Sequence, residues 1–92
     1  MHHFRGILKE GSEPRLDPAN VYIEYLGPQD GTRSNWNGYL LVSDESAVEP
    51  GVLYTLELSD GRSGDLIVDR FVPDETTPGR LRAIFYTETP LA

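Results

Sequence analysis

The chain has 92 residues and no cysteine, and its eight Lys and Arg residues against fifteen Asp and Glu residues give a net charge of −7. This length predicts one domain, residues 1–92, with a small core, and the lack of cysteine excludes disulfides, thiolate metal sites and a thiol nucleophile. The negative charge repels phosphate groups, so we expect neither a nucleic acid nor an anionic membrane as a partner.

The segment that follows Met1 bears on the cellular compartment. Its apolar run is far too short for the central region of a signal peptide, and charged residues follow at once. No other segment approaches the length of a membrane span. From these observations we expect a cytoplasmic protein.

Strand signals dominate the whole chain. Seven prolines and nine glycines interrupt every window long enough for an amphipathic helix, and β-branched and aromatic residues fill the gaps between them. The chain therefore reads as all-β, and we expect a small six-stranded antiparallel barrel or sandwich with hairpin connections. In chain order the expected strands are His3–Lys9, Val21–Leu26, Trp36–Val42, Val52–Leu58, Asp65–Val72 and Arg80–Thr87.

Glycines stand inside the first and the third of these strands. Gly6 comes two residues after Phe4, and Gly38 comes two residues after Trp36. A glycine inside a strand indicates a sharp bend or a close approach of two backbones. We therefore expect the sheet to curl toward closure at these two positions.

Asp-Gly pairs follow the second and the fourth strand, at Asp30-Gly31 and at Asp60-Gly61. Such pairs adopt the positive φ angles that tight hairpins need. We therefore expect the second strand to pair with the third, and the fourth strand to pair with the fifth.

The second of these turns also raises the question of a metal loop. A calcium loop of the EF-hand type needs oxygen ligands at alternating positions after its first Asp, and after Asp60 the chain has Arg62 and Gly64 there. Turn chemistry explains Asp60, Gly61 and Ser63 without an ion. We expect no metal and no cofactor.

A weak internal repeat relates the first two strands to the next two. The segment Phe4–Leu26 recurs as Trp36–Leu58, each with an aromatic-x-Gly-x-Leu strand, an acidic loop, a proline and a strand that carries a tyrosine. Similarity this short also arises by chance. The repeat is therefore either a repeated structural unit or a coincidence of composition.

The apolar residues are too many for one face of a sheet. Alternation places Trp36, Tyr54 and Phe85 in the core, and on the fifth strand it sets Leu66, Val68 and Val72 against Ile67 and Phe71. The surplus on the third, fifth and sixth strands is covered by a loop or a tail, or it meets another chain. We favour a partner surface, formed with a second copy of the chain. The interface candidates are Tyr39, Leu41, Ile67, Phe71, Ile84 and Tyr86.

Catalytic groups are sparse. His2 and His3 are the only histidines, and as neighbours on a strand they point to opposite faces and cannot readily share one metal ion. The serines stand in turn-like contexts, so a Ser-His-Asp arrangement has no support. Carboxylates of one loop, such as Asp44 and Glu45, are the only candidates for hydrolysis, and we expect no enzyme.

Two hypotheses on function follow. The first is a non-catalytic β-barrel module that acts through protein contacts and associates with itself, or otherwise with a protein partner. The alternative is a module that binds a small ligand or a carbohydrate through exposed aromatic residues and the acidic loops Ser43–Glu49 and Asp74–Thr77.

Overall fold

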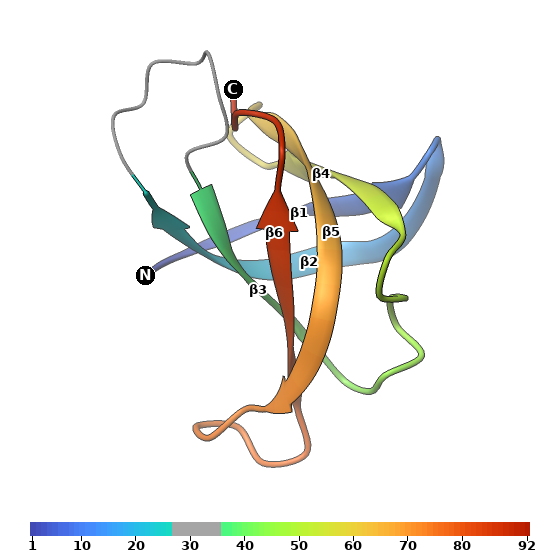
Figure 1. The fold of residues 1–92 in the computed structure, drawn as a ribbon, viewed down its shortest axis with the longest axis vertical. Helices are drawn as coiled ribbons and strands as arrows, with labels where there is room; N and C mark the ends of the chain where they lie inside the picture. Colours follow the sequence, from blue (N-terminus) through green and yellow to red (C-terminus); the bar gives the residue numbers. More distant parts are fainter. Residues whose placement is uncertain (27–35) are drawn as a thin grey trace.

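The fold is a closed antiparallel β-barrel (Figure 1). A computed structural model describes residues 1–26 and 36–92, and within these residues the chain forms six strands and no helix. The strands are β1 (His2–Glu10), β2 (Glu13–Tyr25), β3 (Trp36–Val42), β4 (Leu53–Leu58), β5 (Ser63–Pro73) and β6 (Leu81–Thr87). Their order around the barrel is β1-β2-β3-β6-β5-β4, and β4 pairs back with β1. The expectation of an all-β barrel is confirmed.

Both expected hairpin pairings are present, because β2 pairs with β3 and β4 pairs with β5. The turn at Asp60 has the expected chemistry, since Gly61 has a φ of 95° and the Asp60 carboxylate accepts the Arg62 backbone N–H at 3.0 Å. The other predicted turn, at Asp30-Gly31, lies outside the described residues.

The second strand is the one whose bounds differ most from expectation, because β2 begins at Glu13 rather than at Val21. Its first half contains Pro14 and Pro18, which made this segment resemble a linker. The structure accommodates them because the pairing of β2 with β1 is irregular there, with register shifts on either side of Leu8.

The glycines inside β1 and β3 allow neighbouring backbones to approach, as expected. A Cβ atom at Gly6 would lie 2.2 Å from the carbonyl oxygen of Glu57 on β4, and one at Gly38 would lie 1.8 Å from that of Tyr22 on β2. Any side chain at either position would force the neighbouring strand away. These two glycines therefore permit the curvature that closes the barrel.

The internal repeat does not correspond to a repeated unit of strand pairing. In the first copy β1 pairs with β2, whereas in the second copy β3 lies between β2 and β6, and β4 lies between β5 and β1. Both copies have a glycine at the same position of their first strand, but the strands next to it differ. The hypothesis of a repeated structural unit is therefore not supported by the topology.

The barrel interior holds the three aromatic residues expected in the core. Trp36, Tyr54 and Phe85 are buried, and the Trp36 ring packs against the Phe85 ring at 5.5 Å between centroids. The carboxy-terminal segment covers Trp36, because the indole N–H donates to the carbonyl oxygen of Thr89 at 2.8 Å. Leu91 is buried in the same core.

A bulge in β5 corrects the expected face of two residues. The register of β5 against β6 shifts between Val68 and Arg70, so that Phe71 lies opposite the buried residue Ala83 and packs against the core. Val72, expected inside, lies instead opposite Arg82. One extra residue in a strand reverses the alternation beyond it, and for this reason Phe71 lies on the face opposite to the one expected from alternation.

Candidate functional site

The interface candidates other than Phe71 gather on one outer face of the barrel. They lie on β3, β6 and β5, which are neighbours in the sheet. Tyr39 is directly opposite Ile84, and Ile67 is directly opposite Tyr86. Leu41 is opposite Arg82 on the same face. The strand order therefore brings together residues that the sequence keeps up to 47 positions apart (86 minus 39).

An apolar row crosses this face at right angles to the strands. This row, called the apolar row below, consists of Leu53 on β4, Ile67 on β5 and Tyr86 on β6, each directly opposite the next. Leu53 and Tyr86 are 56% and 46% exposed, which makes them the most exposed large hydrophobic residues inside any strand. Directly opposite side chains lie about 4.5–5.5 Å apart at Cβ, so the row is continuous. Ile84, next on the same face of β6, extends this surface along β6 and lies opposite Tyr39 on β3.

Leu53 was missing from the sequence-based candidates. It shares a face of β4 with the polar residues Thr55 and Glu57, so in the sequence it looked like a single apolar residue on a polar face. Only its register against Ile67 shows that it continues an apolar surface from the neighbouring strand. The sequence signal that could have identified Leu53 is its position, because it breaks the alternation of apolar and polar residues on β4.

A second row on the outer surface of the barrel, over β1, β2, β3 and β6, is made of stacked planar groups, and we call it the aromatic ladder. The His3 ring stacks on Tyr22 at 4.8 Å, and the Tyr22 ring stacks on Tyr39 at 4.9 Å with an interplanar angle of 11°. The Arg82 guanidinium lies 4.6 Å from the centroid of the Tyr39 ring. Because β2 and β6 flank β3, Tyr22 and Arg82 cover opposite faces of Tyr39.

The ladder is anchored by a buried carboxylate from the loop between β5 and β6. Asp74 has a side chain that is 3% exposed, and its Oδ1 accepts a hydrogen bond from Arg82 Nε at 2.7 Å. Thr76 Oγ1 donates to the other oxygen at 3.1 Å. The hydrogen bond from Arg82 holds the pKa of Asp74 below its ordinary value. Burial raises the pKa of Tyr39, and the positive charge of Arg82 opposes that rise.

The arginines on this face have partners within the chain. Besides the pair between Arg82 and Asp74, Arg70 Nη1 contacts Asp69 Oδ2 at 2.6 Å in an exposed pair at the bulge. An exposed pair of this kind contributes little to stability. On this face, the charges of Arg82 and Arg70 are therefore balanced by carboxylates of the same chain.

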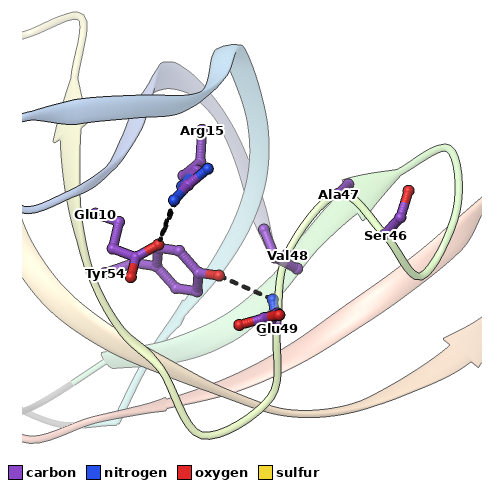
Figure 2. A pocket seen from close by; sticks show the side chains of 7 residues that line it. All are labelled: Glu10, Arg15, Ser46, Ala47, Val48, Glu49 and Tyr54. Carbon is purple, nitrogen blue, oxygen red and sulfur yellow. Dashed lines mark hydrogen bonds and ion pairs between the residues drawn. The ribbon is translucent and has the colours of Figure 1, made fainter.

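A small polar pocket lies near the start of β2 and is separate from this face (Figure 2). It has a volume of about 210 Å³ and is lined by Glu10, Arg15, Ser46, Ala47, Val48, Glu49 and Tyr54. Arg15 Nε donates to Glu10 Oε1 at 3.0 Å on one side of the Tyr54 ring. On the other side the Tyr54 hydroxyl accepts the backbone N–H of Glu49 at 2.8 Å. The predicted acidic loop Ser43–Glu49 therefore forms one wall of a real cavity.

The charged side chains of the turn between β4 and β5 make hydrogen bonds within the chain. Arg62 Nε donates to the Asp60 carboxylate at 3.0 Å, and this hydrogen bond lowers the pKa of Asp60. Arg62 also donates to the Tyr25 hydroxyl at 2.7 Å and lies 5.0 Å from the centroid of the Phe4 ring. Across residues 1–26 and 36–92, no three His, Asp or Glu side chains are grouped so that they could hold a metal ion.

Comparisons with protein-family models, curated proteins and solved structures returned no significant match for this chain. In the part of the chain that the structure describes, no helix is long and apolar enough to cross a membrane.

Proposed function

We propose that this protein is a non-catalytic β-barrel module that acts through protein contacts and associates with a second copy of itself through the outer face of β3, β6, β5 and β4. The observation that carries the proposal is the apolar row with its two highly exposed ends, Leu53 and Tyr86. The barrel is closed, so strand edges cannot add a further strand, and side chains on the outer surface must make the contact.

The charge distribution supports a second copy as the occupant. Two chains that each carry a net charge of −7 repel each other over most of their surface. The face around the apolar row differs because Arg82 and Arg70 already have carboxylate partners. A contact on this face removes apolar surface from water, and the charges of both arginines stay paired within their own chain.

The available area sets the expected strength. A stable interface of standard size takes about 800 Å² from each partner, which is roughly one seventh of the 5350 Å² surface of this molecule. Because the outer face of the barrel is convex, two copies touch over a smaller area than this standard interface. We therefore expect a weak, reversible dimer that forms at concentrations of about 10 μM to 1 mM.

The test is the mass in solution by light scattering over that range of concentration. The wild-type chain should exceed its monomer mass of 10.3 kDa, and Ile84→Asp should reduce the mass to that of a monomer. Ile7→Asp is the matched control, because Ile7 is a half-buried isoleucine on β1 that lies opposite Glu57, four residues along β4 from Leu53. A wild-type chain that stays monomeric at about 1 mM contradicts the proposal.

A second candidate function is the binding of a small ligand in the polar pocket. The cavity between Arg15, Tyr54 and Glu49 supports it, because these side chains bring donors and acceptors to one place. A carbohydrate platform has less support, since the ring faces of Tyr22 and Tyr39 are covered within the ladder. Backbone amide NMR shifts of Ser46–Glu49 on addition of a metabolite panel test this function. Saturable shifts support it, and unchanged spectra across the panel contradict it.

A further inference from the structure

We infer that residues 88–92, called the strap below, bind one end of the barrel as a peptide ligand would, and that the site beneath them accepts an extended peptide of the same chemistry once the strap is displaced. The site lies at the end of the barrel beside Trp36 and the start of β5. It is separate from the apolar row, so this inference does not depend on self-association.

Hydrogen bonds join the strap to β3 and β5. The carbonyl oxygen of Thr89 accepts the indole N–H of Trp36 at 2.8 Å, and Thr89 Oγ1 accepts the backbone N–H of Asp65 at 3.0 Å. Ala92 and Ser63 donate their backbone N–H groups to each other's carbonyl oxygens, at 3.0 Å and 2.9 Å. A reciprocal pair of this kind is the unit of antiparallel pairing. The strap therefore adds to the start of β5 as an extended peptide adds to a sheet.

Leu91 is the apolar anchor of the strap, and Gly64 leaves room for the strap to lie. Leu91 is 6% exposed and packs within the core. A Cβ atom at Gly64 would lie 2.7 Å from Cζ2 of Trp36 and 3.2 Å from the carbonyl oxygen of Pro90. It would also lie 3.4 Å from Leu91 Cδ1. The absence of a side chain at this position therefore creates the groove that the strap fills.

The strap is separable from the barrel, because none of the pairings between the six described strands includes it. The pairing of β6 with β5 reaches Thr87, which is opposite Leu66, and the barrel closes between β1 and β4. Figure 1 shows the strap in red, where it turns over this end of the barrel beyond β6. Its release would uncover Trp36 and the start of β5 while every strand keeps both of its neighbours.

The contacts of the strap define the peptide that the site accepts. One residue must supply a carbonyl oxygen for the Trp36 indole and a hydroxyl oxygen for the N–H of Asp65, as Thr89 does. An aliphatic side chain must follow two positions later, in the place of Leu91. Pro90 between them has no N–H group and so leaves no donor unpaired beside the core. The expected ligand is therefore an extended peptide with a hydroxyl residue, a proline and an aliphatic residue in succession.

The strap competes with such a peptide because it belongs to the same chain. A binding segment on a short tether has an effective concentration on the order of millimolar, which a separate peptide must exceed. A peptide bound by the open site therefore has a lower apparent affinity for the wild-type chain. The strap acts in this way as an intramolecular inhibitor of peptide binding.

The first experiment displaces the strap in the full chain with Leu91→Asp, which puts a charge in the place of the buried anchor. The fluorescence of Trp36, the only tryptophan, should shift to the red because water reaches its ring, while the circular dichroism of the sheet is retained. A synthetic peptide of residues 87–92 should reverse this shift. Its affinity, measured by fluorescence anisotropy of a dye-labelled copy, should be at least about tenfold higher for the variant than for the wild-type chain.

Two controls match this experiment. Leu26→Asp introduces the same change at a leucine that is 61% exposed, and it should leave the fluorescence of Trp36 and the weak peptide binding of the wild-type chain unchanged. The peptide with aspartate in place of its leucine should not bind the Leu91→Asp chain, because it lacks the apolar anchor.

Hydrogen exchange of the wild-type chain tests the separability of the strap without a substitution. The indole N–H of Trp36 and the backbone N–H of Ala92 are both paired through the strap. They should exchange at least about tenfold faster than the most protected amides of β3, because the strap opens while the barrel stays closed.

Fast exchange at the strap together with leucine-dependent binding of the peptide to the Leu91→Asp chain supports the inference. A folded variant that does not bind the peptide overturns it. Exchange at the Trp36 indole that is as slow as in the barrel overturns it as well. If Leu91→Asp does not fold, Leu91→Ala takes its place in the same assay, and failure of both variants to fold overturns the inference because the strap is then part of the barrel.

Discussion

The apolar row and the aromatic ladder both lie on the outer surface of the barrel, share only β6, and differ in what covers their side chains. In the ladder, His3, Tyr22, Tyr39 and Arg82 cover one another across neighbouring strands. In the row, Leu53 and Tyr86 keep about half of their surface open. Both contain outward-facing tyrosines, so the residue type alone does not separate them. The cross-strand neighbour decides whether an outward aromatic residue stabilises the monomer or remains open to a partner.

This difference has an energetic meaning. Each cross-strand aromatic pair in the ladder contributes roughly 0.2–1 kcal/mol to the folded monomer. The open ends of the row contribute little to that stability, because water still covers much of their surface. We therefore expect changes in the ladder to affect unfolding, and changes in the row to affect association.

The largest effect is expected at Phe71, whose register removes it from the outer face. Phe71→Asp should lower the free energy of unfolding by about 3 kcal/mol or more, because it replaces a side chain packed against the core with a charge. Urea denaturation followed by circular dichroism measures this change. Ile84→Asp is the comparison, since Ile84 faces outward and should cost much less. Equal losses for the two variants would contradict the bulge in β5.

The ladder and the row are compared directly by Tyr22→Ala and Tyr86→Ala. Tyr22→Ala should lower the free energy of unfolding by about 1–2 kcal/mol, because it removes two ring contacts. Tyr86→Ala should change stability by less than about 0.5 kcal/mol and should weaken association. Denaturation and sedimentation of both variants measure the two quantities. The comparison fails if the two substitutions change stability by the same amount.

A smaller effect, confined to acid, is expected from the anchor of the ladder. The pKa of Asp74 is lower in the folded chain than in the unfolded chain because Arg82 donates to its carboxylate. Its contribution to stability is therefore present above the unfolded pKa of about 3.9 and is lost as the pH falls through the folded pKa. The stability difference between wild type and Asp74→Asn should be constant near neutral pH and should shrink below about pH 4. A difference that persists undiminished at pH 2 would show that the ionised carboxylate is not its source.

The smallest expected effect is that of salt on association. The row is uncharged and the rest of the surface is acidic, so salt should strengthen the dimer by screening the repulsion between two chains of net charge −7. Sedimentation equilibrium at low and at high salt gives the dissociation constant. A dimer that weakens with salt would mean that ion pairs hold the contact in place of the apolar row.

Much of the fold could be predicted because its causes are local. Asp60-Gly61 forms a hairpin turn through its own backbone preferences, and β3 begins and ends at the predicted residues because a mostly apolar run stands between polar segments. Gly6 and Gly38 predicted close approaches of neighbouring backbones, because a Cβ atom at either position would clash with a carbonyl oxygen of the next strand. The sequence also predicted an apolar surplus on β3, β5 and β6, whose role as an interface stays a prediction.

Other features required the tertiary structure. Sequence alone predicted that the chain is all-β, where most strands lie, and that the second strand pairs with the third and the fourth with the fifth, since turns and alternation act between near neighbours. The bulge that turns Phe71 inward, the register that joins Leu53 to Ile67, and the stacking of His3, Tyr22 and Tyr39 came only from the closed barrel. Each depends on the register between strands distant in the chain, and a shift of one residue would move every side chain to the other face.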